Sequence, residues 1–172
     1  MKEKLDKYIK QHHLFKREDK LILAISGGAD SVALACLLKV LNCNFIMAHC
    51  NFGLRKEESD SDEVFVKKLA KKLNVECVIS NFDTQNFAIQ NKFSIQMAAR
   101  ELRYKWFEAL RLKLDCNFIV TAHHQDDDIE TFFINLLRGT GIKGMLGIHP
   151  KRRNIIRPLL FARKDEIYDF LK

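Results

Sequence analysis

A short polar segment between an apolar run and a helix-like stretch is the first candidate for chemistry. It has the sequence SGGADS and comprises Ser26, Gly27, Gly28, Ala29, Asp30 and Ser31. The two glycines would let the backbone approach a ligand and direct successive N–H groups toward it, and the helix that follows would add its positive N-terminal end. This combination suits a phosphate or pyrophosphate. A carboxylate such as Asp30 would repel that anion unless Mg²⁺ lay between them, because carboxylate and phosphate oxygens can share this ion.

The segment therefore predicts a phosphate site that includes Mg²⁺. The simpler alternative is a glycine turn in which Asp30 only caps the following helix. A second polar segment, HHQDDD at 123–128, also follows an apolar run and offers His123 and Asp127 as candidate site residues. Helix capping is the alternative there too, because acidic residues in a first turn interact favourably with the helix dipole. Asp126 fits that structural role alone.

Two common nucleotide-binding motifs do not explain these segments. The chain has no GxxxxGK[ST] sequence, which excludes the ordinary P-loop. A GxGxxG sequence is present at Gly139, Gly141 and Gly144, but it follows the helix-like stretch IETFFINLLR instead of a strand, which is the wrong context for dinucleotide binding. The C-terminus of a helix explains these glycines better.

The elements that would position both segments alternate along the chain. Strand-like apolar runs lie at 21–25, 45–49, 76–80 and 117–122, and helix-like stretches lie at about 3–13, 31–42, 59–73, 94–114, 126–138 and 163–172. Continuous apolar strands separated by helices predict a doubly wound α/β fold with a parallel sheet. Ligands bind beyond the carboxyl ends of such strands. Three polar segments follow strands, at 26–31, 50–59 and 123–128, and are expected to share one edge of the sheet.

Composition limits the class of protein. The 172 residues predict a single domain, and 47% hydrophobic with 30% charged residues is a globular profile. No apolar run is long enough for a membrane span, and the N-terminus lacks the apolar region of a signal peptide, so a cytoplasmic location is expected. The five cysteines form no CxxC pair and are interpreted as reduced packing residues.

The net charge of +7 is concentrated near the C-terminus. Residues from Arg138 onward contain nine Lys or Arg and three Asp or Glu, whereas residues 1–137 contain 20 and 19. This segment includes Lys151, Arg152 and Arg153. The excess is either solvated surface charge or a contact surface for a polyanion such as nucleic acid.

The motifs together resemble a known family. S-G-G-x-D-S after the first strand is the signature of the PP-loop ATP pyrophosphatases, a Rossmann-like fold whose members form adenylated intermediates from ATP. Further motifs resemble the N-terminal catalytic domain of the tRNA(Ile)-lysidine synthetases; they are AHCNFGLR (48–55), AARELRY (98–104), TAHHQDDDIET (121–131), RGTGIKGMLGI (138–148) and IIRPLL (155–160). Members often have a second histidine where this chain has Phe52. The resemblance implies one catalytic domain over 1–172, with an N-terminal helix at about 1–20, as part of a longer protein.

The resemblance also implies an activity. Carbon 2 of the wobble cytidine of isoleucine tRNA, which has the anticodon CAU, is activated by AMP with release of pyrophosphate, and free L-lysine then displaces AMP to form lysidine. ATP and Mg²⁺ are the implied cofactors, with no membrane partner, and the oligomeric state, a dimer among the possibilities, stays open. The implied roles are metal binding for Asp30 and Asp127, catalysis for these two and His123, ATP binding for residues 26–31 and His49, and substrate binding for Arg55, Arg100 and Arg103.

Two other functions stay open. One is a different PP-loop tRNA-modifying enzyme, although thiolases of this kind usually carry paired cysteines. The other is a non-catalytic ATP-binding module. Release of pyrophosphate in the presence of lysine and tRNA would separate an enzyme from such a module.

Overall fold

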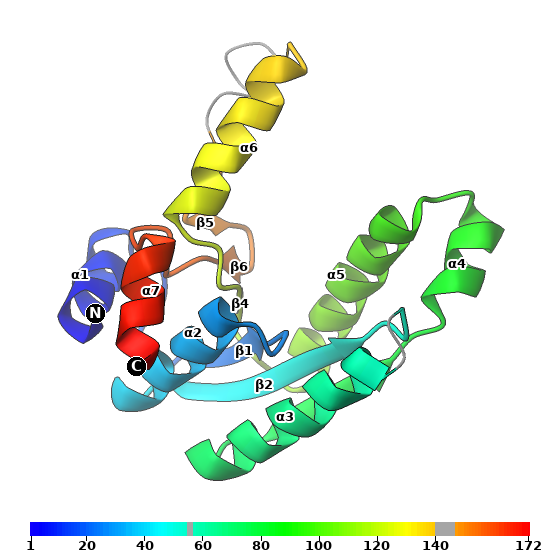
Figure 1. Ribbon diagram of the computed structural model, residues 1–172. Helices are drawn as coiled ribbons and strands as arrows, with labels where there is room; N and C mark the ends of the chain where they lie inside the picture. Colours follow the sequence, from blue (N-terminus) through cyan, green and yellow to red (C-terminus); the bar gives the residue numbers. More distant parts are fainter. Residues whose placement is uncertain (55–56, 140–146) are drawn as a thin grey trace.

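A single mixed sheet with helices on both faces forms the body of the molecule (Figure 1). The computed structural model describes residues 1–54, 57–139 and 147–172. Its elements in chain order are α1 (Lys2–Gln11), β1 (Lys20–Ala24), α2 (Ala29–Val40), β2 (Asn44–Asn51), α3 (Glu57–Leu73), β3 (Cys77–Asn81), α4 (Thr84–Asn91), α5 (Ile95–Lys113), β4 (Phe118–Val120), α6 (Gln125–Leu137), β5 (Lys151–Arg152), β6 (Ile155–Ile156) and α7 (Lys164–Leu171). None of the described helices is long and apolar enough to cross a membrane.

The strand order is β3-β2-β1-β4-β6-β5, and every pairing is parallel except that of β5 with β6. The predicted doubly wound α/β fold is therefore confirmed. The chain proceeds from β1 outward through β2 to β3, and then returns to place β4 on the other side of β1. The strand order thus reverses between β1 and β4, and in open α/β sheets the carboxyl ends of the strands at such a reversal are the usual place for a ligand crevice.

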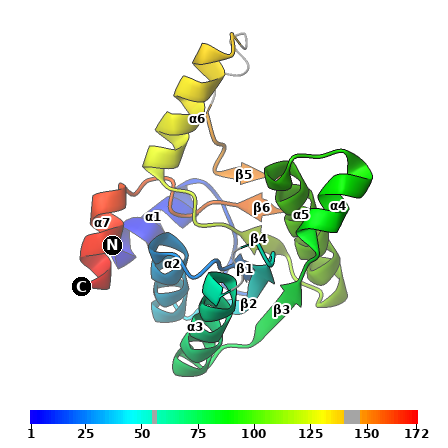
Figure 2. The ribbon, with the colours of Figure 1, turned by 45° about the vertical axis from the view of Figure 1, so that its right-hand side comes forward.

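Alternate residues of the strands pack on opposite faces of the sheet. In β1, Leu21 and Leu23 belong to a buried cluster with side chains of α1, α2, α3 and α7. Ile22 points the other way and packs with Phe107 and Leu110 of α5. Figure 2 shows the strands between α2 and α3 on one side and α5 on the other. The sheet is covered on both faces, which explains why its central strands are apolar without alternation.

Three elements were missed by the sequence analysis. Helix α4 has only two buried residues, Thr84 and Ala88, and therefore lacks a clear apolar period. Local capping stabilises it, since the Asp83 side chain accepts a hydrogen bond from the Asn86 N–H. Strands β5 and β6 have two residues each, which is too short for any periodic pattern. The predicted strand at 117–122 is also shorter than expected, with only Phe118–Val120 in the sheet.

Helix α6 differs from the other helices because it contains no buried residue and extends away from the body (Figure 1). Its exposed apolar side chains are Ile129, Phe132, Phe133, Ile134, Leu136 and Leu137. It ends at Leu137 with Arg138 as its C-cap, and Gly139 follows with φ +65. This confirms that Gly139 follows the C-terminus of a helix, where a left-handed residue is common. Gly141 and Gly144 lie outside the described residues.

The packing predicts very different costs for two leucine substitutions. Leu23 in β1 is 0% exposed, whereas Leu137 in α6 is 87% exposed. We expect Leu23→Ala to lower the free energy of unfolding by about 2–5 kcal/mol, because it removes buried methyl groups and leaves a cavity. The matched control Leu137→Ala should change it by no more than about 0.5 kcal/mol. Urea unfolding measures both, and equal losses would contradict this account of the core.

Candidate active site

A cavity of about 310 Å³ lies at the carboxyl ends of β1 and β4, where the strand order reverses. Segments distant in the sequence contribute to its wall: the glycine segment, the end of β2, helix α5 and the residues after β4. The lining residues are Ala24, Ile25, Ser26, Asp30, Ser31, Cys50, Phe52, Arg103, Tyr104, Phe107, Thr121, Ala122, His123 and Asp127. The predicted convergence of the polar segments at one edge of the sheet is confirmed.

The glycine segment has the geometry of an anion cradle. Gly27 has φ +97, a conformation that L side chains rarely adopt, and a Cβ there would lie 3.3 Å from Asp62 Oδ1. Gly28 is the N-cap of α2, and no side chain caps that helix. The first backbone N–H groups of an α-helix have no intrahelical partner, so they are available to an anion at this end of α2.

Ser31 fixes the shape of this cradle from inside. Its Oγ donates a hydrogen bond to the Gly28 carbonyl at 2.9 Å and accepts one from the Ser26 N–H at 3.2 Å. The Ser26 hydroxyl in turn accepts from the Gly28 N–H at 3.2 Å. These bonds hold the loop in place without a ligand, so little ordering is needed when an anion binds.

The surroundings of the Asp30 carboxylate indicate whether a cation would fit this site. Its Oδ1 atom is buried and has no hydrogen-bond partner among the described residues. A buried carboxylate oxygen without a partner is costly, and a bound cation would satisfy it. The Asp127 carboxylate lines the same cavity. Two carboxylates beside a phosphate site fit Mg²⁺, which usually takes one or two protein carboxylates together with phosphate oxygens and water.

His124, which the sequence analysis did not select, connects these two carboxylates. Its imidazole is buried; Nε2 lies 3.7 Å from Asp30 Oδ2 and Nδ1 lies 3.6 Å from Asp127 Oδ2. His124 is also the N-cap of α6, where Nδ1 accepts the Asp127 N–H at 3.4 Å. A polar residue immediately before the acidic first turn was the available sign of a cap, but its contact with Asp30 comes from the tertiary fold.

The acidic residues after His124 have different surroundings. Asp127 Oδ2 accepts the His124 backbone N–H at 2.9 Å, so this carboxylate caps the helix and also faces the cavity. Asp126 Oδ2 instead accepts the Lys164 N–H at 2.8 Å at the start of α7. Capping of their own helix was the alternative for these acidic residues; Asp127 makes that contact in α6, whereas Asp126 is hydrogen-bonded to the first residue of α7.

His123 is half-buried in the wall of the cavity, and its Nδ1 lies 2.9 Å from Thr121 Oγ1. Burial lowers the pKa of His123 from its ordinary 6.5, and the nearby Arg157 lowers it further, while Asp127 acts in the opposite direction. The imidazole is therefore neutral near pH 7 and can accept a proton.

The aromatic part of the cavity is formed around Phe52. Its ring stacks on Phe82 with 5.6 Å between centroids, and the Arg103 guanidinium lies 5.2 Å from the Phe52 centroid. Cys50 lines the same region, and burial raises its pKa to about 12, so its thiol stays protonated. All five cysteines are unpaired, consistent with their interpretation as reduced packing residues.

The structure does not bring every predicted residue to this cavity. His49 is buried, and its Nδ1 lies 2.9 Å from the Ile25 carbonyl oxygen, so it supports the backbone next to the glycine segment without lining the cavity. Arg100 lies over the Tyr104 ring and lines an adjoining cavity. Arg55 lies outside the described residues.

The electrostatic surroundings of His123 predict its titration. We expect its pKa to lie below 6.5, and Asp127→Asn to lower it further, because that substitution removes the charge that favours the imidazolium. The pH dependence of the His123 ring resonances in NMR measures both. Asp169→Asn, at the exposed end of α7, is the control and should leave the titration unchanged. A pKa above 6.5 in the unsubstituted chain would contradict the buried position of this ring.

Comparison with known proteins identifies the domain. Residues 1–172 match the family model of the PP-loop domain. The chain is 47% identical over all its 172 residues to a tRNA(Ile)-lysidine synthase of Bacteroides thetaiotaomicron, and 50% identical over 165 residues, 95% of the chain, to one of Porphyromonas gingivalis. A Clostridium perfringens protein of the same name is 39% identical over 175 aligned residues, which include 99% of the chain. The chain spans only 40%, 36% and 37% of these three relatives.

Solved structures agree on the fold. The U34-tRNA thiolase NcsA from Methanococcus maripaludis superposes with a TM-score of 0.78 at 24% identity, over 98% of this chain and 62% of that one. The NH3-dependent NAD synthetase from Campylobacter jejuni gives a TM-score of 0.64 at 18% identity, over 98% of this chain and 69% of that one. The glycine cradle at the strand-order reversal and the match over the whole sequence lead to the same conclusion: this chain belongs to the PP-loop family, whose domain binds ATP.

Proposed function

We propose that this chain carries the catalytic site of a tRNA(Ile)-lysidine synthase, an ATP-dependent ligase of tRNA processing. The substrates are ATP, L-lysine and isoleucine tRNA. The observation that carries the proposal is the shared cavity in which the glycine cradle meets Asp30, His123 and Asp127. Relatives of that name align with almost the whole chain at 39–50% identity, which favours this chemistry over other uses of a PP-loop domain.

The reaction requires two displacements. In the first, the O2 oxygen of the wobble cytidine attacks the α-phosphorus of ATP; a C–O–P linkage forms, the bond to the β-phosphate oxygen breaks, and pyrophosphate leaves. In the second, the side-chain amine of lysine attacks carbon 2, a C–N bond forms, AMP leaves, and the amine loses a proton. Neither step changes an oxidation state, which agrees with a cavity whose only thiol, among the described lining residues, is held protonated.

The residues of the cavity match these requirements. The N–H groups at the start of α2 would bind the phosphates, and Asp30 and Asp127 would hold Mg²⁺. When bound, Mg²⁺ supplies positive charge that stabilises the departing pyrophosphate. His124 lies between the two carboxylates, with Nε2 3.7 Å from Asp30 Oδ2 and Nδ1 3.6 Å from Asp127 Oδ2. His123 is neutral and can take the proton that the amine loses as it bonds to carbon 2.

A thiolase is the second enzyme class that the comparisons raise, since NcsA superposes well and carries a [4Fe-4S] cluster. The cysteines of this chain do not support that chemistry. They lie at positions 36, 43, 50, 77 and 116, and within the described parts of the chain no three cysteines are grouped as ligands of such a cluster would be. Ligation is therefore the function that these side chains fit better.

The test is to incubate the chain with isoleucine tRNA, ATP, Mg²⁺ and isotopically labelled lysine, and to measure pyrophosphate release and the mass of the wobble nucleoside. We expect lysidine to form. Asp30→Asn should reduce pyrophosphate release by about 100-fold, a loss typical of removing one group that stabilises developing charge. Asp115→Asn is the matched control. Asp115 is exposed and follows α5 with φ +51, a conformation that asparagine tolerates. This variant should release pyrophosphate at the rate of the unsubstituted chain.

Each other outcome points to a different function. Pyrophosphate release without labelled lysine in the nucleoside would favour another PP-loop enzyme. ATP binding without pyrophosphate release would favour a non-catalytic module. Full activity of Asp30→Asn would remove Asp30 from the mechanism.

A further inference from the structure

A second cavity of about 460 Å³ adjoins the first and shares Tyr104, His123 and Asp127 with it. It lies between α5, α6 and the segment that contains β5 and β6. Its lining residues are Arg100, Tyr104, His123, Asp127, Glu130, Thr131, Asn135, Gly147, Ile148, His149, Arg152 and Arg157. Three arginines thus converge beside the candidate active site: Arg100 from α5, Arg152 from β5 and Arg157 from the residues after β6. The carboxylates in this wall, Asp127 and Glu130, both come from α6.

Arg157 is the least expected member of this group. It is only 9% exposed, its Nη1 donates to the His149 carbonyl at 2.8 Å, and its buried Nε has no hydrogen-bond partner among the described residues. Burial lowers the pKa of Arg157, the nearby Arg152 and Arg100 lower it further, and the opposing influence comes from Tyr104. A buried cation whose neighbours are mainly other cations is costly, and an anion in the cavity would offset that cost.

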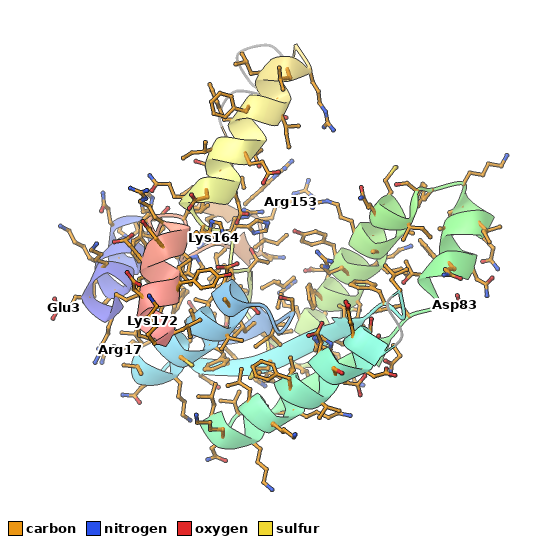
Figure 3. All side chains as sticks on the ribbon, in the orientation of Figure 1. Glu3, Arg17, Asp83, Arg153, Lys164 and Lys172 are labelled. Carbon is orange, nitrogen blue, oxygen red and sulfur yellow. The ribbon has the colours of Figure 1, made fainter. Side chains whose placement is uncertain are left out.

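The three basic residues 151–153 point in different directions and do not form one surface. Lys151 points away from the cavity: its Nζ donates to the Leu14 carbonyl at 3.1 Å and lies 4.3 Å from the centroid of the Phe118 ring. Arg152, next in β5, lines the arginine cavity. Arg153 occupies the turn between β5 and β6, where Figure 3 labels it, and is exposed with φ +53. Lys151 and Arg152 therefore leave β5 in different directions, and both interpretations of this basic segment, solvated charge or a contact surface for a polyanion, stay open.

We infer that Arg157, Arg152 and Arg100 form a binding site for a backbone phosphate of the RNA strand that carries the reacting base. This inference rests on the proposed function and adds a subsite to it. A guanidinium presents a planar fork of donors that matches phosphate oxygens. The exposure of the arginines increases from the buried Arg157 to the exposed Arg100 and Arg152. A phosphate can therefore enter from solvent and still reach a desolvated cation.

The arrangement of the two cavities favours an RNA phosphate over other anions. The phosphates of ATP already have a cradle at the start of α2, on the far side of the shared wall. A base that reacts with the α-phosphorus must lie at that wall, beside His123 and Asp127. Its own phosphodiesters then extend into the adjoining space, which the arginines line. A backbone phosphodiester and the carboxylate of lysine each carry one negative charge, so it is the position of this cavity beside the reacting base, and not the number of arginines, that favours the phosphate.

Binding of an anticodon stem-loop of isoleucine tRNA, followed by fluorescence at several salt concentrations, tests the inference without using catalysis. We expect Arg152→Gln to weaken binding about 5–50-fold at low salt. It should also reduce the slope of the logarithm of the binding constant against the logarithm of the salt concentration by about 0.7. This is the change expected when the protein neutralises one phosphate fewer of a single-stranded RNA. Arg153→Gln is the matched control in the adjacent position and should alter affinity less than 2-fold. Arg157→Lys keeps the charge but removes the fork, and should weaken binding. It also removes the Nη1 hydrogen bond to the His149 carbonyl, so binding is measured well below the midpoint of its thermal unfolding.

Several results would overturn the inference. Unchanged RNA binding in Arg152→Gln with a raised KM for lysine would assign the cavity to the amino acid carboxylate. Equal losses in Arg152→Gln and Arg153→Gln would indicate diffuse surface charge, and absence of any salt-dependent binding by the unsubstituted chain would exclude the subsite. Failure of the proposed function is separate, because it appears as absence of lysidine with RNA binding intact.

Discussion

The parallel pairing of β1 with β4, from Leu21–Phe118 to Leu23–Val120, is the contact on which the rest of the site depends. It brings together two segments almost a hundred residues apart and fixes both with their carboxyl ends at the same edge. Because β1 also pairs with β2 on its other side, the strand order reverses between β1 and β4. The glycine cradle and the start of α6 therefore line one cavity.

In this cavity, the carboxylates of Asp30 and Asp127 lie next to a glycine cradle that is suited to phosphate. Asp30 and Asp127 lie on either side of one buried imidazole, whose Nε2 and Nδ1 are 3.7 and 3.6 Å from their oxygens. The arrangement is electrostatically unfavourable by itself, and the unpartnered Asp30 Oδ1 shows that it is not fully compensated by described protein groups. Such a site gains from the simultaneous binding of a cation and a phosphate, so the two should bind cooperatively.

The sequence predicted the sheet, its helices and the loop convergence, because buried strands and long helices have strong periodic patterns. The glycine segment could also be identified, since glycine at a left-handed position such as Gly27 has a local cause. His124 and Arg157 could not be assigned in this way. Their environments arise from partners far along the chain: Asp30 for His124, and Arg100 with Tyr104 for Arg157. The inward position of His49, toward the Ile25 carbonyl and not toward the cavity, is likewise a property of the packed sheet.

The hairpin of β5 and β6 limits how this part of the chain can change in evolution. Its pairs, Lys151–Ile156 and Arg152–Ile155, set the side from which each basic residue leaves the strand. Neighbouring residues in a strand point to opposite faces, so inserting or deleting one residue here would exchange the places of a lysine held by backbone carbonyls and an arginine that lines a cavity. Replacing Arg153 in the turn alters one exposed side chain. Changing the length of the hairpin instead exchanges the residues that point to the two faces of the strand. Relatives should therefore vary in residue type at this hairpin while keeping its number of residues constant.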